Sequence, residues 1–417
     1  MTVVRTSLGN IQGEQTKGVF RFLGIPFAEP ITRHRRFLPA APRSPWSGSL
    51  LATKHGSTCI QPPMAGLFAR VSPSAESCGE DCLNLNIWTP DVKGSHPVLV
   101  WIHGGAYYAG SGSEDGYDGS SFAKNGVVCV TINYRLGAQG FLDLSSFDSR
   151  FESSGCLGIT DQVLALEWVR DHIADFGGDP NQVTLAGESA GAMSVSTLMA
   201  VPSAKGLFRG AIAQSGAAST VVSRETSILV TQALLEELKI DEPSALEQVS
   251  DHELLAAQIR LMTEVSESLD INRFGELTGS PMAFQPVFGT SVLPEHPLVA
   301  IERGTAKDVA LMQGMTRHEA PIFFYEMADE LTAEMAWEMS KPTLEHGRLD
   351  KAKFKQYYHG NPLLSGLEVA GHVMSDMMFT VPILQMLAAH SKHSDSTWCY
   401  RFDWENPEFN GMLGAHH

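Results

Sequence analysis

Short apolar runs recur along the chain and are separated by stretches with helical periodicity. Two early runs, 19–23 and 80–88, alternate apolar and polar residues in the manner of β-strands. The later runs are continuously apolar, as expected for strands that are covered on both faces. These later strand candidates lie at 98–102, 127–132, 183–186, 208–214, 309–313 and 398–402.

Helical patterns occur between the strand candidates, most clearly at 161–176 and 190–199. Buried strands that alternate with helices predict an α/β fold, with an open, mostly parallel central sheet and helices on both faces. Two further segments, about 223–277 and 328–364, are polar and helical and contain no buried strand. We expect them to be helical insertions over the edge of the sheet, where such segments commonly form pocket walls.

One strand candidate runs directly into a turn of small residues around Ser189, and a helix pattern follows. Strand, sharp turn and helix form the context of a nucleophile elbow with the pattern Gly-x-Ser-x-Gly. Gly187 and Gly191 flank the serine, and a Cβ at either position would collide with the opposite limb of the turn. The motif alone is weak because a loop serine between two turn glycines has the same pattern. The strand and helix on either side favour the nucleophile interpretation.

A second glycine-containing turn, 103–108, follows the strand candidate 98–102. Glycines there allow backbone amides to point at a ligand, and such amides form an oxyanion hole together with the amide that follows the nucleophile. The alternative is a turn that only requires positive φ at its glycines. The elbow downstream favours the oxyanion hole.

The charge and cysteine content exclude several classes of function. The net charge is −17, from 30 Lys+Arg against 47 Asp+Glu, which makes a nucleic-acid or anionic-membrane partner a poor expectation. No apolar run is long enough for a transmembrane helix, and the first residues lack the pattern of a signal peptide, so we expect a cytoplasmic protein. The 6 cysteines form no C-x-x-C pair, so no zinc site or other metal is expected.

The ordered motifs of the chain resemble those of the type-B carboxylesterases, a family that includes cholinesterases and bacterial para-nitrobenzyl esterases. The resemblance extends from about Gly9 to the last residue and implies one α/β-hydrolase domain over 1–417, most similar to the bacterial members. The motifs that carry it lie at 80–88, 103–106, 133–135, 176–180 and 187–191.

The resemblance implies a Ser-Glu-His triad in that chain order. Ser189 matches the nucleophile, Glu319 matches the acid in its Gly-x-Thr-x-x-Glu segment, and His417 matches the base in its Gly-Ala-x-His segment. A serine needs a base to remove its proton, and a carboxylate orients that base and stabilises its charged form. Taken singly, Glu319 also fits a solvated carboxylate at a helix start, and His417 also fits a frayed terminus or a tag remnant.

The same resemblance implies the groups around the triad. The oxyanion amides map to Gly105, Ala106 and Ala190. Ser215 and Glu188 map to positions next to the triad, and a plain strand-end serine is the alternative for Ser215.

Other family matches are structural. The resemblance implies two buried ion pairs, Arg135 with Asp161 and Arg36 with Glu80. It also implies a disulfide between two cysteines, which stay reduced in a reducing compartment; these are Cys59 and Cys82. Four aromatic residues are candidates either for the pocket lining or for the core; these are Tyr107, Tyr108, Phe323 and Phe324.

The family continues past the histidine with an apolar segment and closing helices, whereas this chain ends at His417. We therefore expect a chain that is truncated at its C-terminus and a poorly restrained base. With a complete C-terminus, the expected function is a serine carboxylesterase acting on small-molecule esters through an acyl-enzyme, without a cofactor. The alternatives are hydrolysis of carbamates, amides or thioesters at the same site, or a non-catalytic cholinesterase-like binding protein.

Overall fold

The computed structural model describes residues 1–63, 78–346, 365–408, 411 and 413–417. Within these ranges the main sheet has 11 strands in the order β1-β2-β3-β5-β7-β6-β8-β9-β12-β13, and β4 pairs with β2. Its strands are β1 (Thr2–Thr6), β2 (Gly9–Thr16), β3 (Val19–Pro26), β4 (Ser49–Leu51), β5 (Asn84–Thr89), β6 (His96–Ile102), β7 (Val128–Ile132), β8 (Gly178–Glu188), β9 (Gly210–Gln214), β12 (Ala310–Thr316) and β13 (Thr397–Phe402). A small second sheet pairs β10 (Val222–Ser223) with β11 (Val287–Phe288).

The helices of the described chain lie between the strands and in the two predicted insertions. They are α2 (Ser120–Lys124), α3 (Gly137–Phe141), α4 (Leu157–His172), α5 (Ala190–Leu198), α6 (Arg224–Leu238), α7 (Asp251–Glu267), α8 (Ile271–Phe274), α9 (Pro297–Glu302), α10 (Pro321–Phe324), α11 (Ala333–His346), α13 (Gly366–Ser375) and α14 (Val381–Ser391). One π-helical turn, η10 (Asp376–Thr380), joins α13 to α14.

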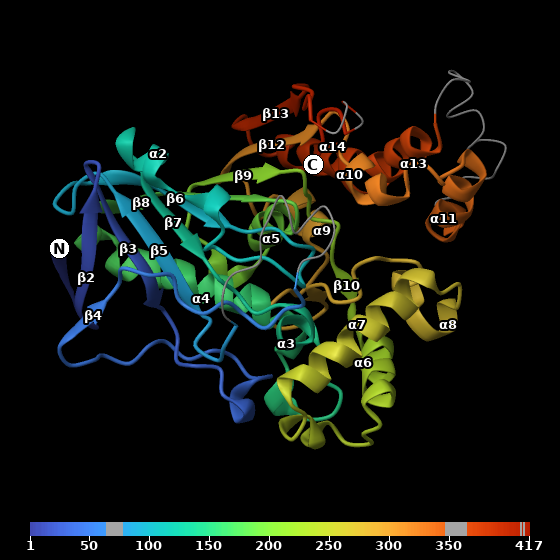
Figure 1. Ribbon diagram of the computed structural model, residues 1–417, viewed down its shortest axis with the longest axis horizontal. Helices are drawn as coiled ribbons and strands as arrows, with labels where there is room; N and C mark the ends of the chain where they lie inside the picture. Colours follow the sequence, from blue (N-terminus) through green and yellow to red (C-terminus); the bar gives the residue numbers. More distant parts are fainter. Residues whose placement is uncertain (64–77, 347–364, 409–410, 412) are drawn as a thin grey trace.

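The sheet is antiparallel at its N-terminal end and parallel from β7 to β13. Side chains of β6 show why the predicted strands are continuously apolar. Val98 and Val100 belong to the large core on the face that α4 and α5 cover, whereas Leu99 belongs to a separate cluster that includes Ala123 of α2. Alternate residues of a strand point to opposite faces, so helices on both faces require apolar residues at every position. The predicted mostly parallel sheet with helices on both faces is confirmed (Figure 1).

The prediction that 398–402 is a buried strand is wrong in its burial. The segment does form a strand, β13, but Trp398 is 55% exposed and Phe402 is 49% exposed. The physical reason is its place in the sheet, because β13 pairs with β12 on one side and is the last strand in the described order.

Helices occupy the predicted insertion at 223–277, and Ser223 and Ser250 cap α6 and α7. Gln258 of α7 accepts a hydrogen bond from the amide of Ala138 at 2.8 Å, which ties this segment to the body of the molecule. In the second segment, 328–364, the structure has α11, and residues 347–364 lie outside the described ranges. Among the described helices, none has the length and hydrophobicity needed to cross a bilayer.

The predicted ion pair between Arg135 and Asp161 is confirmed. Both side chains are fully buried, and the Arg135 guanidinium donates to the two Asp161 oxygens at 2.6 and 2.7 Å. The prediction that Arg36 pairs with Glu80 is wrong. Arg36 pairs with Asp251 at 2.7 Å, because the start of α7 brings that carboxylate over the guanidinium.

Of the two states considered for Cys59 and Cys82, a disulfide or reduced thiols, the structure has the reduced thiols. Cys59 and Cys82 are free thiols, both buried, and their Sγ atoms lie 2.8 Å apart in a hydrogen bond. Burial raises the pKa of the Cys59 thiol well above its ordinary value, which keeps this thiol neutral.

Candidate active site

The turn after β8 has the geometry of a nucleophile elbow. Ser189 stands between β8 and α5 with φ 54° and ψ −125°, a backbone conformation that only a tightly determined turn maintains. A Cβ on Gly191 would lie 2.1 Å from the carbonyl oxygen of Ile102, and one on Gly187 would lie 2.6 Å from the backbone of Gly191. The two glycines therefore allow β6, β8 and α5 to approach one another, as the sequence predicts.

The loop after β6 runs beside this elbow. Three successive residues have positive φ, namely Gly105 at 105°, Ala106 at 51° and Tyr107 at 62°. A Cβ on Gly105 would lie 2.1 Å from the carbonyl oxygen of Ala109. Within the described chain, the amide groups of Gly105, Ala106 and Ala190 donate no hydrogen bond. These three N–H groups are therefore available to an oxygen atom bound between the loop and the elbow.

The predicted acid and base are in direct contact. Glu319 follows β12 and is fully buried, and its Oε1 accepts a hydrogen bond from the amide of Thr316 at 2.8 Å. Its Oε2 lies 2.9 Å from Nδ1 of His417, whose side chain is only 8% exposed. An ionised carboxylate only accepts hydrogen bonds, so Nδ1 of His417 carries a proton, and whenever the ring is neutral its lone pair is on Nε2.

Two phenylalanines enclose the His417 ring. The centroid of Phe379 lies 4.8 Å from the ring centroid of His417, and that of Phe323 lies 5.4 Å away. Phe379 belongs to the π-helical turn η10 and is buried, while Phe323 of α10 is 41% exposed. Sequence reasoning missed Phe379, because no local pattern indicates that a residue 38 positions before His417 packs against it.

Within the described residues, the structure does not join Ser189 and His417 by a hydrogen bond. Nε2 of His417 is buried and lacks a hydrogen-bond partner there, and it lies 3.1 Å from Oε1 of Glu188, the residue immediately before the serine. The His417 ring thus reaches the elbow, but its Nε2 faces Glu188 and not Ser189. Hydrogen bonds of catalytic groups are often long or misaligned without substrate and tighten in the complex.

The surrounding charges shift the titration of both groups. Burial alone lowers the pKa of His417, but the charge of Glu188 and the hydrogen bond and charge of Glu319 more than offset this, so the pKa of His417 is raised above 6.5. Burial raises the pKa of Glu188 above 4.5, and nearby Glu319 and Glu114 act in the same direction, while His417 opposes them. The pocket therefore favours a positive imidazolium between the two carboxylates.

Ser215 lies beside the elbow, at the carboxyl end of β9. It has φ 55°, it is buried, and its amide donates to the carbonyl of Gly314 at 2.9 Å. The next residue is close to the nucleophile, because a Cβ on Gly216 would lie 2.6 Å from the carbonyl oxygen of Ser189. The structure thus brings Ser215 next to the turn that holds Ser189.

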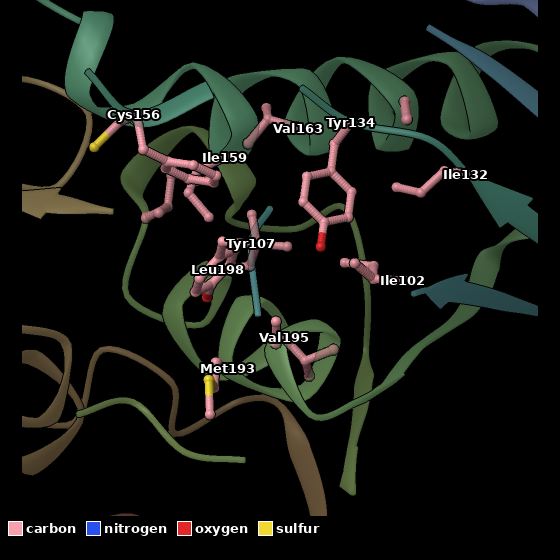
Figure 2. Close-up of a cluster of buried hydrophobic side chains, with 14 of the residues drawn as sticks. Ile102, Tyr107, Ile132, Tyr134, Cys156, Ile159, Val163, Met193, Val195 and Leu198 are labelled. Atoms are coloured by element: carbon pink, nitrogen blue, oxygen red, sulfur yellow. The ribbon is translucent and has the colours of Figure 1, made fainter. Parts of the chain in front are cut away.

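Two of the four aromatic candidates, Tyr107 and Phe324, belong to the core. Tyr107 is fully buried in the apolar cluster of Figure 2, together with Leu198 and Ile159, so the core interpretation holds for it. Phe324 is also buried, in a separate cluster with α11 and α13. Phe323, which packs beside His417, is exposed, and Tyr108 is half-buried. In the part of the chain that the structure describes, no three His, Cys, Asp or Glu side chains are grouped to hold a metal ion.

Comparisons with known proteins identify the family of the chain. The carboxylesterase family model matches residues 1–417. A para-nitrobenzyl esterase from Bacillus subtilis is 39% identical over 424 residues, covering 99% of this chain and 81% of that protein. A phenmedipham hydrolase from Pseudarthrobacter oxydans is 33% identical and covers 100% of this chain and 80% of that protein.

The fold is also similar to solved structures. The crystal structure of the Geobacillus stearothermophilus carboxylesterase EST55 at pH 6.2 superposes with a TM-score of 0.83 and 35% identity, covering 98% of this chain and 81% of that one. A para-nitrobenzyl esterase structure superposes with a TM-score of 0.80 and 36% identity, covering 100% and 83%. The sheet and its helices are thus an α/β-hydrolase fold, and the chain belongs to the carboxylesterase family as a carboxylic-ester hydrolase.

Proposed function

We propose that the chain is a serine carboxylesterase that uses Ser189 as nucleophile, His417 as base and Glu319 as the acid that orients it. The observation that carries the proposal is the 2.9 Å contact between Nδ1 of His417 and buried Glu319. It leaves the Nε2 lone pair free at the elbow, which is the arrangement that a general base needs.

In the proposed reaction, the Ser189 oxygen attacks the ester carbonyl carbon while Nε2 of His417 takes the hydroxyl proton. The carbonyl oxygen becomes negative and accepts hydrogen bonds from the amides of Gly105, Ala106 and Ala190. The C–O bond to the alcohol then breaks, and the alcohol leaves with the proton from the imidazolium. A water molecule attacks the acyl-enzyme by the same route and releases the carboxylic acid.

The proposal requires Nε2 of His417 to exchange its contact with Glu188 for the Ser189 hydroxyl. The imidazolium that forms in this step is favoured by the raised pKa of His417. Glu188, whose Oε1 lies 3.1 Å from Nε2 in the structure, remains a neighbour of the charged ring after the exchange and, when ionised, stabilises it together with Glu319. Glu188 is therefore proposed as an electrostatic neighbour of the triad, and Ser215 as a residue that supports the elbow.

Covalent labelling tests the nucleophile. We expect a fluorophosphonate to add to Ser189 alone, as located by mass spectrometry of peptides, and Ser189→Ala to lose both the adduct and the hydrolysis of a nitrophenyl ester. Ser391→Ala, at an exposed serine of α14, is the matched control and should keep both. An adduct on another residue, or turnover by Ser189→Ala close to that of the unmodified chain, would contradict the proposal.

The names of two relatives suggest substrates to compare. A para-nitrobenzyl ester and phenmedipham should be assayed side by side with a thioester and an amide. We expect the para-nitrobenzyl ester to be hydrolysed with the largest kcat/KM. A larger kcat/KM on phenmedipham would favour the alternative specificity, and binding without turnover of any of them would favour the non-catalytic alternative.

We also propose that the chain forms one hydrolase domain in which 223–277 and 328–364 are insertions. The contact of Gln258 with Ala138 and that of Asp251 with Arg36 support this for the first insertion. A single calorimetric unfolding transition is expected, and two separated transitions would argue for two domains.

A further inference from the structure

We propose that His318 is a positioning residue that holds the C-terminal loop 413–417 so that His417 reaches the elbow. The inference rests on the proposed role of His417 as the base. His318 immediately precedes the proposed acid, Glu319, and it contacts the loop through Ala415.

His318 contacts Ala415 with both its backbone and its side chain. Its amide donates to the carbonyl oxygen of Ala415 at 2.9 Å, and its Nδ1 accepts from the amide of Ala415 at 3.1 Å. The backbones of His318 and His416 form a parallel bridge. The backbone N–H and C=O of Ala415 are thus both hydrogen-bonded to His318, which follows β12.

Close packing adds to these hydrogen bonds. Gly414 has φ 58°, and a Cβ at that position would lie 2.2 Å from Nδ1 of His318. The loop therefore approaches the imidazole as closely as glycine allows. Three residues after Gly414, His417 meets Glu319. Consecutive residues therefore hold the loop, His318 through the backbone of Ala415 and Glu319 through the side chain of His417.

The side-chain contact exists in only one protonation state. An amide N–H donates to Nδ1, so this nitrogen must carry a lone pair, and the proton of the neutral ring is on Nε2. When His318 takes up a second proton, Nδ1 becomes a donor and loses the amide of Ala415 as a partner. Protonation therefore replaces the hydrogen bond by a repulsive contact between the N–H of Nδ1 and the amide N–H of Ala415. This contact lies two residues before the base, His417.

The charged and titratable groups that face His318 determine the pH at which it is protonated. Burial lowers the pKa of His318, and the charges of Arg317 and His372 act in the same direction, while Glu405 and Asp403 oppose them. The rings of His318 and His372 are 6.3 Å apart, and Arg317 pairs with Glu405 at 3.6 Å. His318 is thus neutral at neutral pH. Because the pKa of His318 is lowered and that of His417 is raised, His318 is protonated at a lower pH than His417, on the acid side of the activity profile.

Two substitutions separate the acceptor from the rest of the side chain. His318→Leu removes the acceptor, whereas His318→Asn keeps an oxygen near the position of Nδ1 that does not titrate. We expect His318→Leu to lower kcat roughly 10- to 100-fold, because misplacement of a catalytic group by about 1 Å has an effect of that size. KM should change little, and His318→Asn should recover most of the loss.

The pH profile provides a readout that a merely structural role would not move. In the unmodified chain, the acid limb of log kcat should steepen from a slope of one to a slope of two, as His318 protonates after His417. In His318→Asn it should keep a slope of one. His372→Asn, which alters the neighbouring ring but not the contact with Ala415, is the matched control and should keep the steeper limb.

Melting temperatures show whether each variant is folded, and His417→Ala separates the two proposals. If His417→Ala is inactive while a folded His318→Leu has full kcat, the positioning role is overturned and the triad stands. If His417→Ala is active, the proposed base is wrong and the role of His318 fails with it. Equal kcat losses in folded His318→Leu and His318→Asn would also overturn the role of the acceptor.

Discussion

The two sides of the candidate site are held in different ways. On the nucleophile side, Ser189 follows β8, whose neighbours in the sheet are β6 and β9 and whose Val183 and Leu185 are buried in the main core. On the base side, Glu319 follows β12, next to the exposed strand β13, and His417 belongs to a short loop. Glycine-mediated close packing determines the first side, and a few directional contacts determine the second.

This difference has a physical consequence. A packed turn between central strands cannot move without disturbing the core, so damage there is expected to appear as lost stability. A loop held by hydrogen bonds and two aromatic rings can shift at little cost to the fold, so damage there is expected to appear as lost turnover.

Glu319→Gln should have the largest effect, and only on activity. The amide side chain keeps an oxygen for the amide of Thr316, but it removes the charge that stabilises the imidazolium. In a Ser-His-acid triad this kind of change lowers kcat about 10⁴-fold, or about 5.5 kcal/mol. Steady-state kinetics beside a melting curve tests this. A loss below tenfold, or a fall in activity explained by unfolding, would contradict the proposed acid.

Asp161→Ala should have the opposite signature, with a large effect on stability. It leaves the fully buried guanidinium of Arg135 without its partner, which costs about 3–5 kcal/mol in free energy of unfolding. Asp171→Ala, which breaks the exposed pair with Arg170, is the matched control and should cost at most about 1 kcal/mol. Urea unfolding measures both, and similar losses in the two variants would show that burial does not decide the cost.

Gly105→Ala should lower turnover by misplacing the oxyanion loop. The added Cβ would lie 2.1 Å from the Ala109 carbonyl oxygen, and the native φ of 105° disfavours any side chain. Loss of one oxyanion donor costs about 2.7–4 kcal/mol in transition-state stabilisation. Gly116→Ala is the control, because a Cβ there meets no atom within 4 Å. Unchanged kcat in Gly105→Ala would remove this loop from the oxyanion hole.

Glu188→Gln should have the smallest effect, a shift of the acid limb of the pH profile. The base accepts a proton only when it is neutral, so activity falls as the pH drops through the pKa of His417. That pKa is raised, and the charge of Glu188 is the first of the causes that raise it, so the limb lies at a higher pH than for an ordinary histidine. Removing the charge should move the limb to lower pH, and a limb that stays in place would show that Glu188 is not ionised there.

The sequence predicted the strands and the elbow because these features are local. Gly187, Ser189 and Gly191 lie within five residues, and their spacing reflects a steric need of the turn itself. The continuously apolar runs reflect coverage on both faces. This coverage fails for β13 and also at Met312 of the adjacent β12, which is 41% exposed, because no local pattern tells strands at the edge of the sheet from central ones. The contact of Glu319 with His417 was predicted from family motifs and not from spacing.

Contacts between distant segments were decided by the tertiary structure alone. Arg36 pairs with Asp251 because α7 lies over it, and Phe379 packs on His417 because a π-helical turn directs it there. The hold of His318 on Ala415 likewise joins segments almost 100 residues apart. The strands and the elbow could therefore be predicted from the sequence, since they follow from short-range sterics and periodicity, whereas the proposed acid and base came from family motifs. Which partner each side chain meets was decided by packing, because many carboxylates and rings in the chain could satisfy the same charge or surface.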